Sequence, residues 1–167
     1  ANASASFNGT STSGFGYDLN GQTVNLTGGG TLALSGQSST NFGFNLVGNA
    51  TALVQGGTLS MSGSSAGTSG LYFGAVLNAT VATGSAFNLI GNSSASSAAA
   101  VNLGGTINLL SGSGNVTGGG NMTITGNQSS TNAGIWTPGL TLNVQAGNLN
   151  MIGLATSGVG FYQIGVL

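Results

Sequence analysis

One eight-residue motif recurs four times along this chain with little change. It reads Gly-Gly-Thr-Leu-Ala-Leu-Ser-Gly at residues 29–36 and Gly-Gly-Thr-Leu-Ser-Met-Ser-Gly at residues 56–63, and related copies occupy residues 119–126 and 146–153. With two degenerate copies included, the closing glycines are Gly9, Gly36, Gly63, Gly91, Gly126 and Gly153. Their spacings of 27, 27, 28, 35 and 27 residues are typical of repeat architectures, in which each repeat is one unit and neighbours stack.

Inside the motif, large apolar residues alternate with small or polar ones. Leu32 and Leu34 alternate with Ala33 and Ser35, which is the two-residue period of a strand with one buried face. The other repeats keep this alternation, so equivalent side chains are expected to stack in inward columns. The main column predicted for the first strand of each repeat is Phe7, Leu34, Met61, Leu89, Ile124 and Met151.

A second alternating stretch begins about seven residues after each closing glycine. Its first inward position is predicted to hold Tyr17, Phe44, Leu71, Ala99, Trp136 and Phe161 in the six repeats. Asp18 falls between two such inward positions and is expected to point outward. A third and looser stretch follows, which pairs Val24 with Leu26 in the first repeat and Thr51 with Leu53 in the second.

Three short strands in roughly 27 residues predict an all-β fold, a β-solenoid (β-helix) of about six coils. Helices are disfavoured by the density of Gly, Ser, Thr and Asn and by the lack of a 3.6-residue period. We expect residues 1–167 to form one solenoid domain. The seven extra residues between the fourth and fifth repeats are assigned to a flexible, glycine-rich loop insertion at 111–120, because an insertion at a turn leaves the stacking intact.

The charge composition excludes several classes of function. The chain has no Lys, Arg, His or Cys, and its only charged side chain is Asp18. The chain therefore has no basic residues to contact the phosphates of a nucleic acid. One side-chain carboxylate is also too few for a metal site or for general acid–base catalysis. We expect no enzyme activity, no catalytic residue, no cofactor and no metal. No apolar run reaches the length of a transmembrane helix.

Asn-x-Ser/Thr sequons are about twice as frequent as the roughly five that chance would give. Nine occur, and seven of them are candidate glycosylation sites: Asn25, Asn49, Asn78, Asn92, Asn115, Asn121 and Asn127. Asn25 and Asn121 are predicted to face outward beside inward residues. The alternative is that Asn and Thr are simply favourable surface residues of a β-solenoid.

Neither end of the predicted solenoid carries a capping helix or a charged residue, although exposed strand edges invite pairing with another chain. This pattern favours self-association into a homopolymer over a segment of a longer protein. The predicted assembly interface is Phe161, Tyr162, Ile164, Val166 and Leu167. Because the chain is nearly neutral, stacking of copies meets little electrostatic repulsion.

The repeated Gly-Gly-[Thr/Asn]-[Leu/Met]-x-[Leu/Met/Ile]-x-Gly unit resembles the β-solenoid repeats of bacterial surface adhesins, namely autotransporter passengers and filamentous-haemagglutinin-like exoproteins. The resemblance implies secretion, display outside the cell, and a role in adhesion or biofilm with cell-surface glycans or receptors as partners. The lack of Lys and Arg departs from those families and favours a specialised fibre subunit. Two alternatives stay open: an ice-binding solenoid, which would need a regular Thr ladder, and a segment of a longer secreted adhesin.

Overall fold

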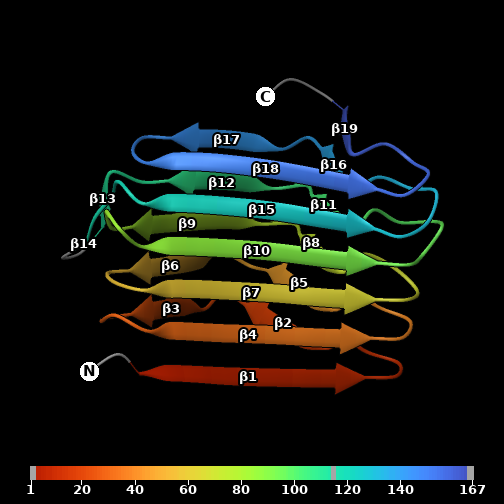
Figure 1. Ribbon diagram of the computed structural model, residues 1–167, viewed down its shortest axis with the longest axis horizontal. Helices are drawn as coiled ribbons and strands as arrows, with labels where there is room; N and C mark the ends of the chain where they lie inside the picture. Colours follow the sequence, from red (N-terminus) through yellow and green to blue (C-terminus); the bar gives the residue numbers. More distant parts are fainter. Residues whose placement is uncertain (1–2, 114–115, 165–167) are drawn as a thin grey trace.

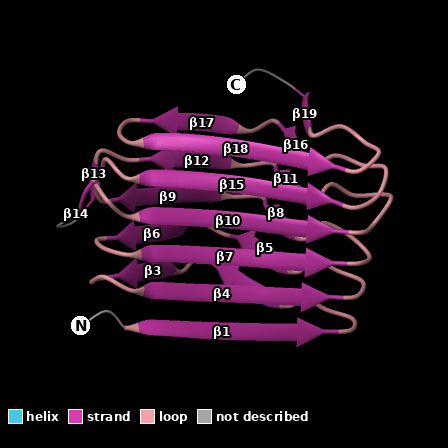
Figure 2. Ribbon diagram, viewed as in Figure 1, coloured by secondary structure: helices cyan, strands magenta, loops and turns pink. Residues whose placement is uncertain are grey.

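The computed structural model describes residues 3–113 and 116–164, and within these ranges the chain forms strands and turns but no helix. Six coils of roughly 27 residues stack on one another, and each coil contributes one strand to each of up to three parallel sheets (Figure 1). The same view coloured by secondary structure contains strands and loops only (Figure 2). The predicted fold class, an all-β solenoid, is therefore confirmed.

Successive coils pair in parallel along each sheet. Sheet A contains β1 (Ser4–Ser11), β4 (Thr31–Ser38), β7 (Thr58–Ser65), β10 (Ala86–Ser93), β15 (Asn121–Gln128) and β18 (Asn148–Ala155). Sheet B contains β2 (Tyr17–Asn20), β5 (Phe44–Val47), β8 (Leu71–Phe73), β11 (Val101–Leu103), β16 (Ile135–Pro138) and β19 (Phe161–Ile164). Sheet C contains β3 (Thr23–Leu26), β6 (Ala50–Val54), β9 (Val76–Val81), β12 (Thr106–Leu109) and β17 (Thr141–Val144).

The register of sheet A stacks the repeated motif on itself. Leu34 lies opposite Met61, Met61 opposite Leu89, and Leu89 opposite Ile124. These side chains are buried, and with Phe44 and Leu71 from sheet B they belong to one apolar core that runs along the stack. One coil cannot bury its own apolar face, so the stacking of neighbours supplies most of the burial.

The closing glycines are required by close packing of two backbones. A Cβ added to Gly63 would overlap the carbonyl oxygen of Gly70, which leads into sheet B, and Gly36 and Gly153 meet the equivalent carbonyls of Gly43 and Gly160. None of the closing glycines has a positive φ. The motif therefore ends in glycine because sheet A approaches the start of sheet B too closely for any side chain.

The turns from sheet C back to sheet A use glycine for a different reason. Gly57 and Gly147 have φ values of 75° and 81°, a conformation that L-residues with a side chain rarely adopt. Both lie just before the first strand of the next coil, in the Gly-rich corners that the sequence marks as turns.

Three register predictions for the looser stretches are wrong. In the fourth coil Val101, not Ala99, lies opposite Leu71. In the fifth coil the inward residue is Ile135, whereas Trp136 takes the neighbouring outward register. In the second coil the inward residues of sheet C are Ala52 and Val54, and Thr51 and Leu53 alternate with them on the outer side.

The extra length of the fourth coil is divided between two corners. Val101 follows Gly91 by ten residues, whereas Leu71 follows Gly63 by eight, so two of the seven additional residues lie in the turn between sheets A and B. The other five lie after β12. There β13 (Gly112–Ser113) and β14 (Val116–Thr117) form a short antiparallel pair, so part of the predicted loop at 111–120 is paired strand.

Candidate functional surfaces

Titratable side chains do not cluster in this molecule. The described residues contain no group of three or more His, Cys, Asp or Glu side chains that could hold a metal ion. Asp18 is exposed on β2, as predicted, and its Oδ1 accepts a hydrogen bond of 2.9 Å from Asn45 Nδ2. The surfaces that remain to be considered act through neutral hydrogen-bonding groups and apolar contact.

The first end face is formed by the free edges of β1, β2 and β3. Phe7 belongs by register to the buried column of Leu34, yet its side chain is 55% exposed because no coil lies beneath it. Tyr17 and Val24 are partly buried and pack against the core from the same coil. Tyr17 stacks on Phe44 in the next coil, with ring centroids 5.1 Å apart. The inward columns of all three sheets thus end at this face.

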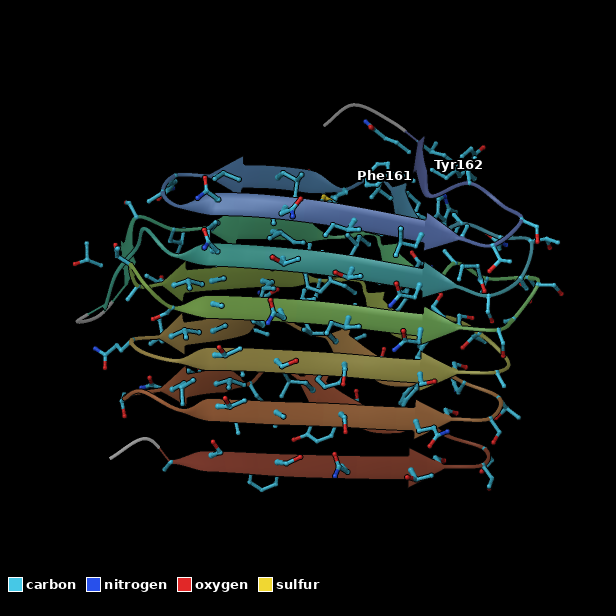
Figure 3. The ribbon with its side chains drawn as sticks, viewed as in Figure 1. Phe161 and Tyr162 are labelled. Atoms are coloured by element: carbon cyan, nitrogen blue, oxygen red, sulfur yellow. The ribbon has the colours of Figure 1, made fainter. Side chains whose placement is uncertain are left out.

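The last end face is formed by β17, β18 and β19. Of the predicted interface, Phe161, Tyr162 and Ile164 are 38%, 50% and 49% exposed (Figure 3), and Val166 and Leu167 lie outside the described residues. Met151 and Leu149, which continue the inward columns of sheet A, are only partly buried. Both end faces therefore combine a free strand edge with inward apolar side chains, such as Phe7 and Phe161, that a further coil would cover. Tyr162 and Ile164 instead take the outward register of Trp136 and Pro138.

The outer face of sheet A is uncharged, mixes polar residues with apolar ones such as Ile90 and Ile152, and is irregular. Its central column holds Ser6, Ala33, Ser60, Asn88, Thr123 and Asn150. Thr occupies the same outward register on this sheet in at most two successive coils, at Thr31 and Thr58. The regular Thr ladder that the ice-binding alternative would need does not occur here.

Buried polar side chains build the corner between sheets A and B. The hydroxyls of Ser38, Ser65 and Ser93 each donate to a backbone carbonyl of the preceding coil at 2.6–2.7 Å. Each also accepts from backbone N–H groups of its own turn. In the fifth coil Gln128 takes this place, and its longer side chain reaches Ala95 O and Ala98 O across the lengthened turn of the fourth coil. This corner is thereby fixed coil by coil.

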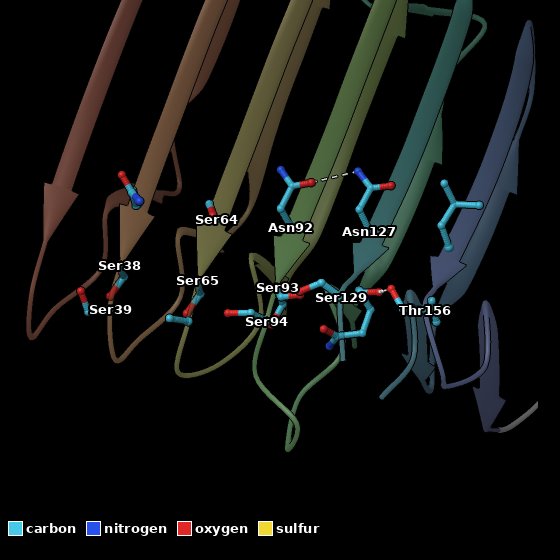
Figure 4. A pocket seen from close by; sticks show the side chains of 15 residues that line it. Ser38, Ser39, Ser64, Ser65, Asn92, Ser93, Ser94, Asn127, Ser129 and Thr156 are labelled. Carbon is cyan, nitrogen blue, oxygen red and sulfur yellow. Dashed lines mark hydrogen bonds between the residues drawn. The ribbon is translucent and has the colours of Figure 1, made fainter. Parts of the chain in front are cut away.

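A groove runs along the outside of the same corner, across the coils (Figure 4). We name it the corner groove; it has a volume of about 710 Å³, it is open to solvent, and its lining is partly polar and partly apolar. One wall is the outward row Gln37, Ser64, Asn92, Asn127 and Leu154, and the other is Ser39, Ala66, Ser94, Ser129 and Thr156. A second hollow of about 360 Å³ shares Gln37, Ser64 and Asn92 with it and extends toward the first coil. No pattern in the sequence predicts this groove.

The candidate glycosylation sites differ in their accessibility. Asn25, Asn49 and Asn121 are exposed, whereas Asn78, Asn92 and Asn127 are half-buried, and Asn115 lies outside the described residues. The side-chain amide nitrogen of Asn127 donates to Asn92 Oδ1 at 2.9 Å. A glycan attached to that nitrogen would disrupt this hydrogen bond between neighbouring coils. A glycan must be attached at an exposed side chain, and Asn25 and Asn49 meet this requirement best because they are exposed.

Within the described ranges, no helix is long and apolar enough to cross a membrane. Comparisons with protein-family models, with curated proteins and with solved structures give no match for this chain.

Proposed function

We propose that this chain is a non-enzymatic structural subunit of an extracellular fibre, in which a second copy stacks on each end face. The observation that carries the proposal is the exposure of column residues at both ends, Phe7 on one face and Phe161 on the other. In each inner coil the equivalent side chains are covered by the next coil. A further coil of the same type would complete their burial at the ends.

The two end faces match each other in register. If β18 of one copy lies beside β1 of the next in the register of sheet A, Met151 covers Phe7 and Gly153 lies beside Gly9. In sheet B the same displacement places Phe161 on Tyr17, which continues an inward column of aromatic and aliphatic residues. The contact joins two different faces, so it does not close after two copies and generates a filament.

The energetics of this contact favour association. Free edges of parallel sheets present unpaired backbone N–H and C=O groups, and pairing with a second chain satisfies them. The side chains that become buried are large and apolar, and each contributes about 1.5–3 kcal/mol when fully removed from water. The chain carries one negative charge in total, so copies approach without appreciable repulsion.

Composition and the resemblance of the repeats support the rest of the proposal. The absence of Lys and Arg leaves no cleavage site for trypsin-like proteases, which suits a fibre displayed outside the cell. The repeat unit resembles that of bacterial surface adhesins, and this resemblance supports a role in adhesion or in a biofilm matrix. The lone carboxylate at Asp18 supports a non-catalytic role.

The test is sedimentation velocity over a range of concentrations, with one charge placed on each end face. Wild-type protein should form oligomers that grow with concentration, and Phe7→Asp and Phe161→Asp should each shift it toward monomer, because stacking would bury an unpaired carboxylate. Asn150→Asp adds the same charge on the exposed outer side of β18 and should assemble as the wild type does. A wild-type chain that stays monomeric at every concentration contradicts the proposal. That result would favour the alternative in which further coils of a longer adhesin cover the apolar residues of the end faces.

A further inference from the structure

We propose that the corner groove binds an extended, neutral polysaccharide chain that lies along the solenoid axis across the second to sixth coils. The groove lies on the outside of the corner between sheets A and B, whereas the end faces lie at the two ends of the stack. The groove meets the last end face only at the end of β18, and the rest of its lining takes no part in the filament contact.

The chemistry of the groove selects an uncharged, hydroxyl-rich ligand. Its polar groups are hydroxyls and carboxamides, mainly from Ser39, Ser64, Ser94, Asn92, Asn127 and Gln37, and apolar surface from residues such as Ala66 and Leu154 completes the lining. No charged side chain lines it. Phosphates, sulfates and carboxylates would lose hydration in the groove without gaining a contact to a cationic side chain. Sugar hydroxyls can instead replace their hydrogen bonds to water with hydrogen bonds to neutral protein groups, at little cost in free energy.

Side-chain amides in the groove keep unused hydrogen-bonding capacity. Asn127 Nδ2 donates to Asn92 Oδ1 at 2.9 Å, which aligns the two amides along the groove (Figure 4). This bond leaves Asn92 Nδ2 as a donor and Asn127 Oδ1 as an acceptor with no protein partner among the described residues. Gln37 is exposed in the same row two coils away. A ligand that follows the row would meet both donors and acceptors, as polyhydroxylated sugars require.

The groove is fixed before any ligand binds. Its floor is the backbone between the two rows, and successive coils are joined there by Ala66 N–H to Ser38 O and Ser94 N–H to Ser65 O bonds of 3.3 and 3.1 Å. The buried Ser65 and Ser93 hydroxyls lock the turns beneath. A preformed site loses little conformational entropy on binding, which favours affinity from weak neutral hydrogen bonds.

The direction and period of the groove favour a glycan over a peptide. Equivalent wall residues recur once per coil, at the inter-strand spacing of about 4.8 Å, which is close to the length of one pyranose unit in an extended chain. An extended peptide would instead need unpaired backbone groups, and those on the floor are already used within sheet A and its turns. Exposed Leu154 at one end of the row offers apolar contact to the C–H face of a sugar ring.

Isothermal titration calorimetry with a panel of neutral linear hexasaccharides, built from glucose, mannose, galactose or N-acetylglucosamine, tests the proposal. At least one member should bind wild-type protein at millimolar concentration or below. In the double variant Asn92→Ala/Asn127→Ala, loss of two hydrogen bonds should weaken binding by about tenfold or more. The matched control is Asn121→Ala/Asn148→Ala, which removes one amide–amide bond of 3.0 Å at the start of β15 and β18, away from the groove, and should change affinity less than about twofold.

Circular dichroism melting of both variants separates loss of binding from loss of fold. Each pair of substitutions removes one exposed or half-buried amide–amide bond, so the two melting temperatures should fall by a similar small amount. The proposal is wrong if no member of the panel binds, if both double variants lose affinity equally, or if sulfated and uronic-acid hexasaccharides bind more tightly than neutral ones. Filament formation by the proposed end-face contact is unaffected by any of these results.

Discussion

Gly63 offers a sharp test of how the repeated motif determines the fold. A Cβ at this position would overlap the carbonyl oxygen of Gly70 and lie 2.5 Å from the backbone nitrogen of Phe44. These two groups form a hydrogen bond of 2.8 Å between adjacent coils, so no side-chain rotation can relieve the clash. Loss of that bond costs about 1 kcal/mol and overpacking about 1–3 kcal/mol. We therefore expect Gly63→Ala to lower the free energy of unfolding by about 2–4 kcal/mol.

Urea unfolding followed by circular dichroism measures this loss, with Gly104→Ala as the control. A Cβ on Gly104 would meet nothing nearer than Pro138 O at 3.7 Å, and its φ is not in the positive range. Its replacement by alanine should leave stability unchanged or raise it by up to about 1 kcal/mol, because the unfolded chain loses conformational freedom. Equal midpoints for wild type and Gly63→Ala, with unchanged slopes, would refute the argument that backbone contact requires the closing glycines.

Two further substitutions probe the core and the corner. Met61→Asp should prevent cooperative folding because it buries an unpaired carboxylate, whereas Ser60→Asp on the outer side of the same strand should cost less than about 1 kcal/mol. Comparable circular dichroism spectra and melting temperatures for both would contradict the inward assignment of Met61. Gln128→Ala should cost about 1–3 kcal/mol by thermal or urea unfolding, because it leaves the carbonyls of the lengthened turn unpaired. Gln37→Ala, at an exposed position, should leave the free energy of unfolding almost unchanged. Equal losses of stability in the two variants would show that Gln128 does not stabilise the lengthened turn.

The sequence predicts sheet A well because two independent signals agree there. Alternation identifies the inward face, and the closing glycines set the register from one coil to the next. Leu34, Met61, Leu89 and Ile124 are consequently stacked as expected. At the ends the same column is exposed or half-buried, at Phe7 and Met151, because burial of a column residue needs a coil on each side.

Sheets B and C were harder to predict because small residues weaken the alternation. In the run from Ser93 to Ala100 every residue is Ser or Ala, so the pattern cannot reveal the two extra residues that shift the next inward position to Val101. In β6 the inward positions are the small Ala50 and Ala52, while the larger Leu53 faces outward. Side-chain size therefore misleads in β6, where small residues face the core.

The corner groove was not predictable because it arises from tertiary geometry. Its wall residues are ordinary polar residues of a β surface, and only the position of the corner brings Asn92 and Ser94 to opposite sides of one hollow. Gln128 is the one residue that carried a local signal. It stands where Ser38, Ser65 and Ser93 stand in earlier coils, and this substitution accompanies the longer turn that it contacts.

Electron microscopy of the native protein without denaturant tests the central proposal most directly. Six coils at the inter-strand spacing of about 4.8 Å give an axial length of about 29 Å per subunit. Filaments with an axial repeat near that value, lost in Phe161→Asp, are the expected result. Discrete short rods that do not associate at high concentration would contradict end-to-end stacking of copies.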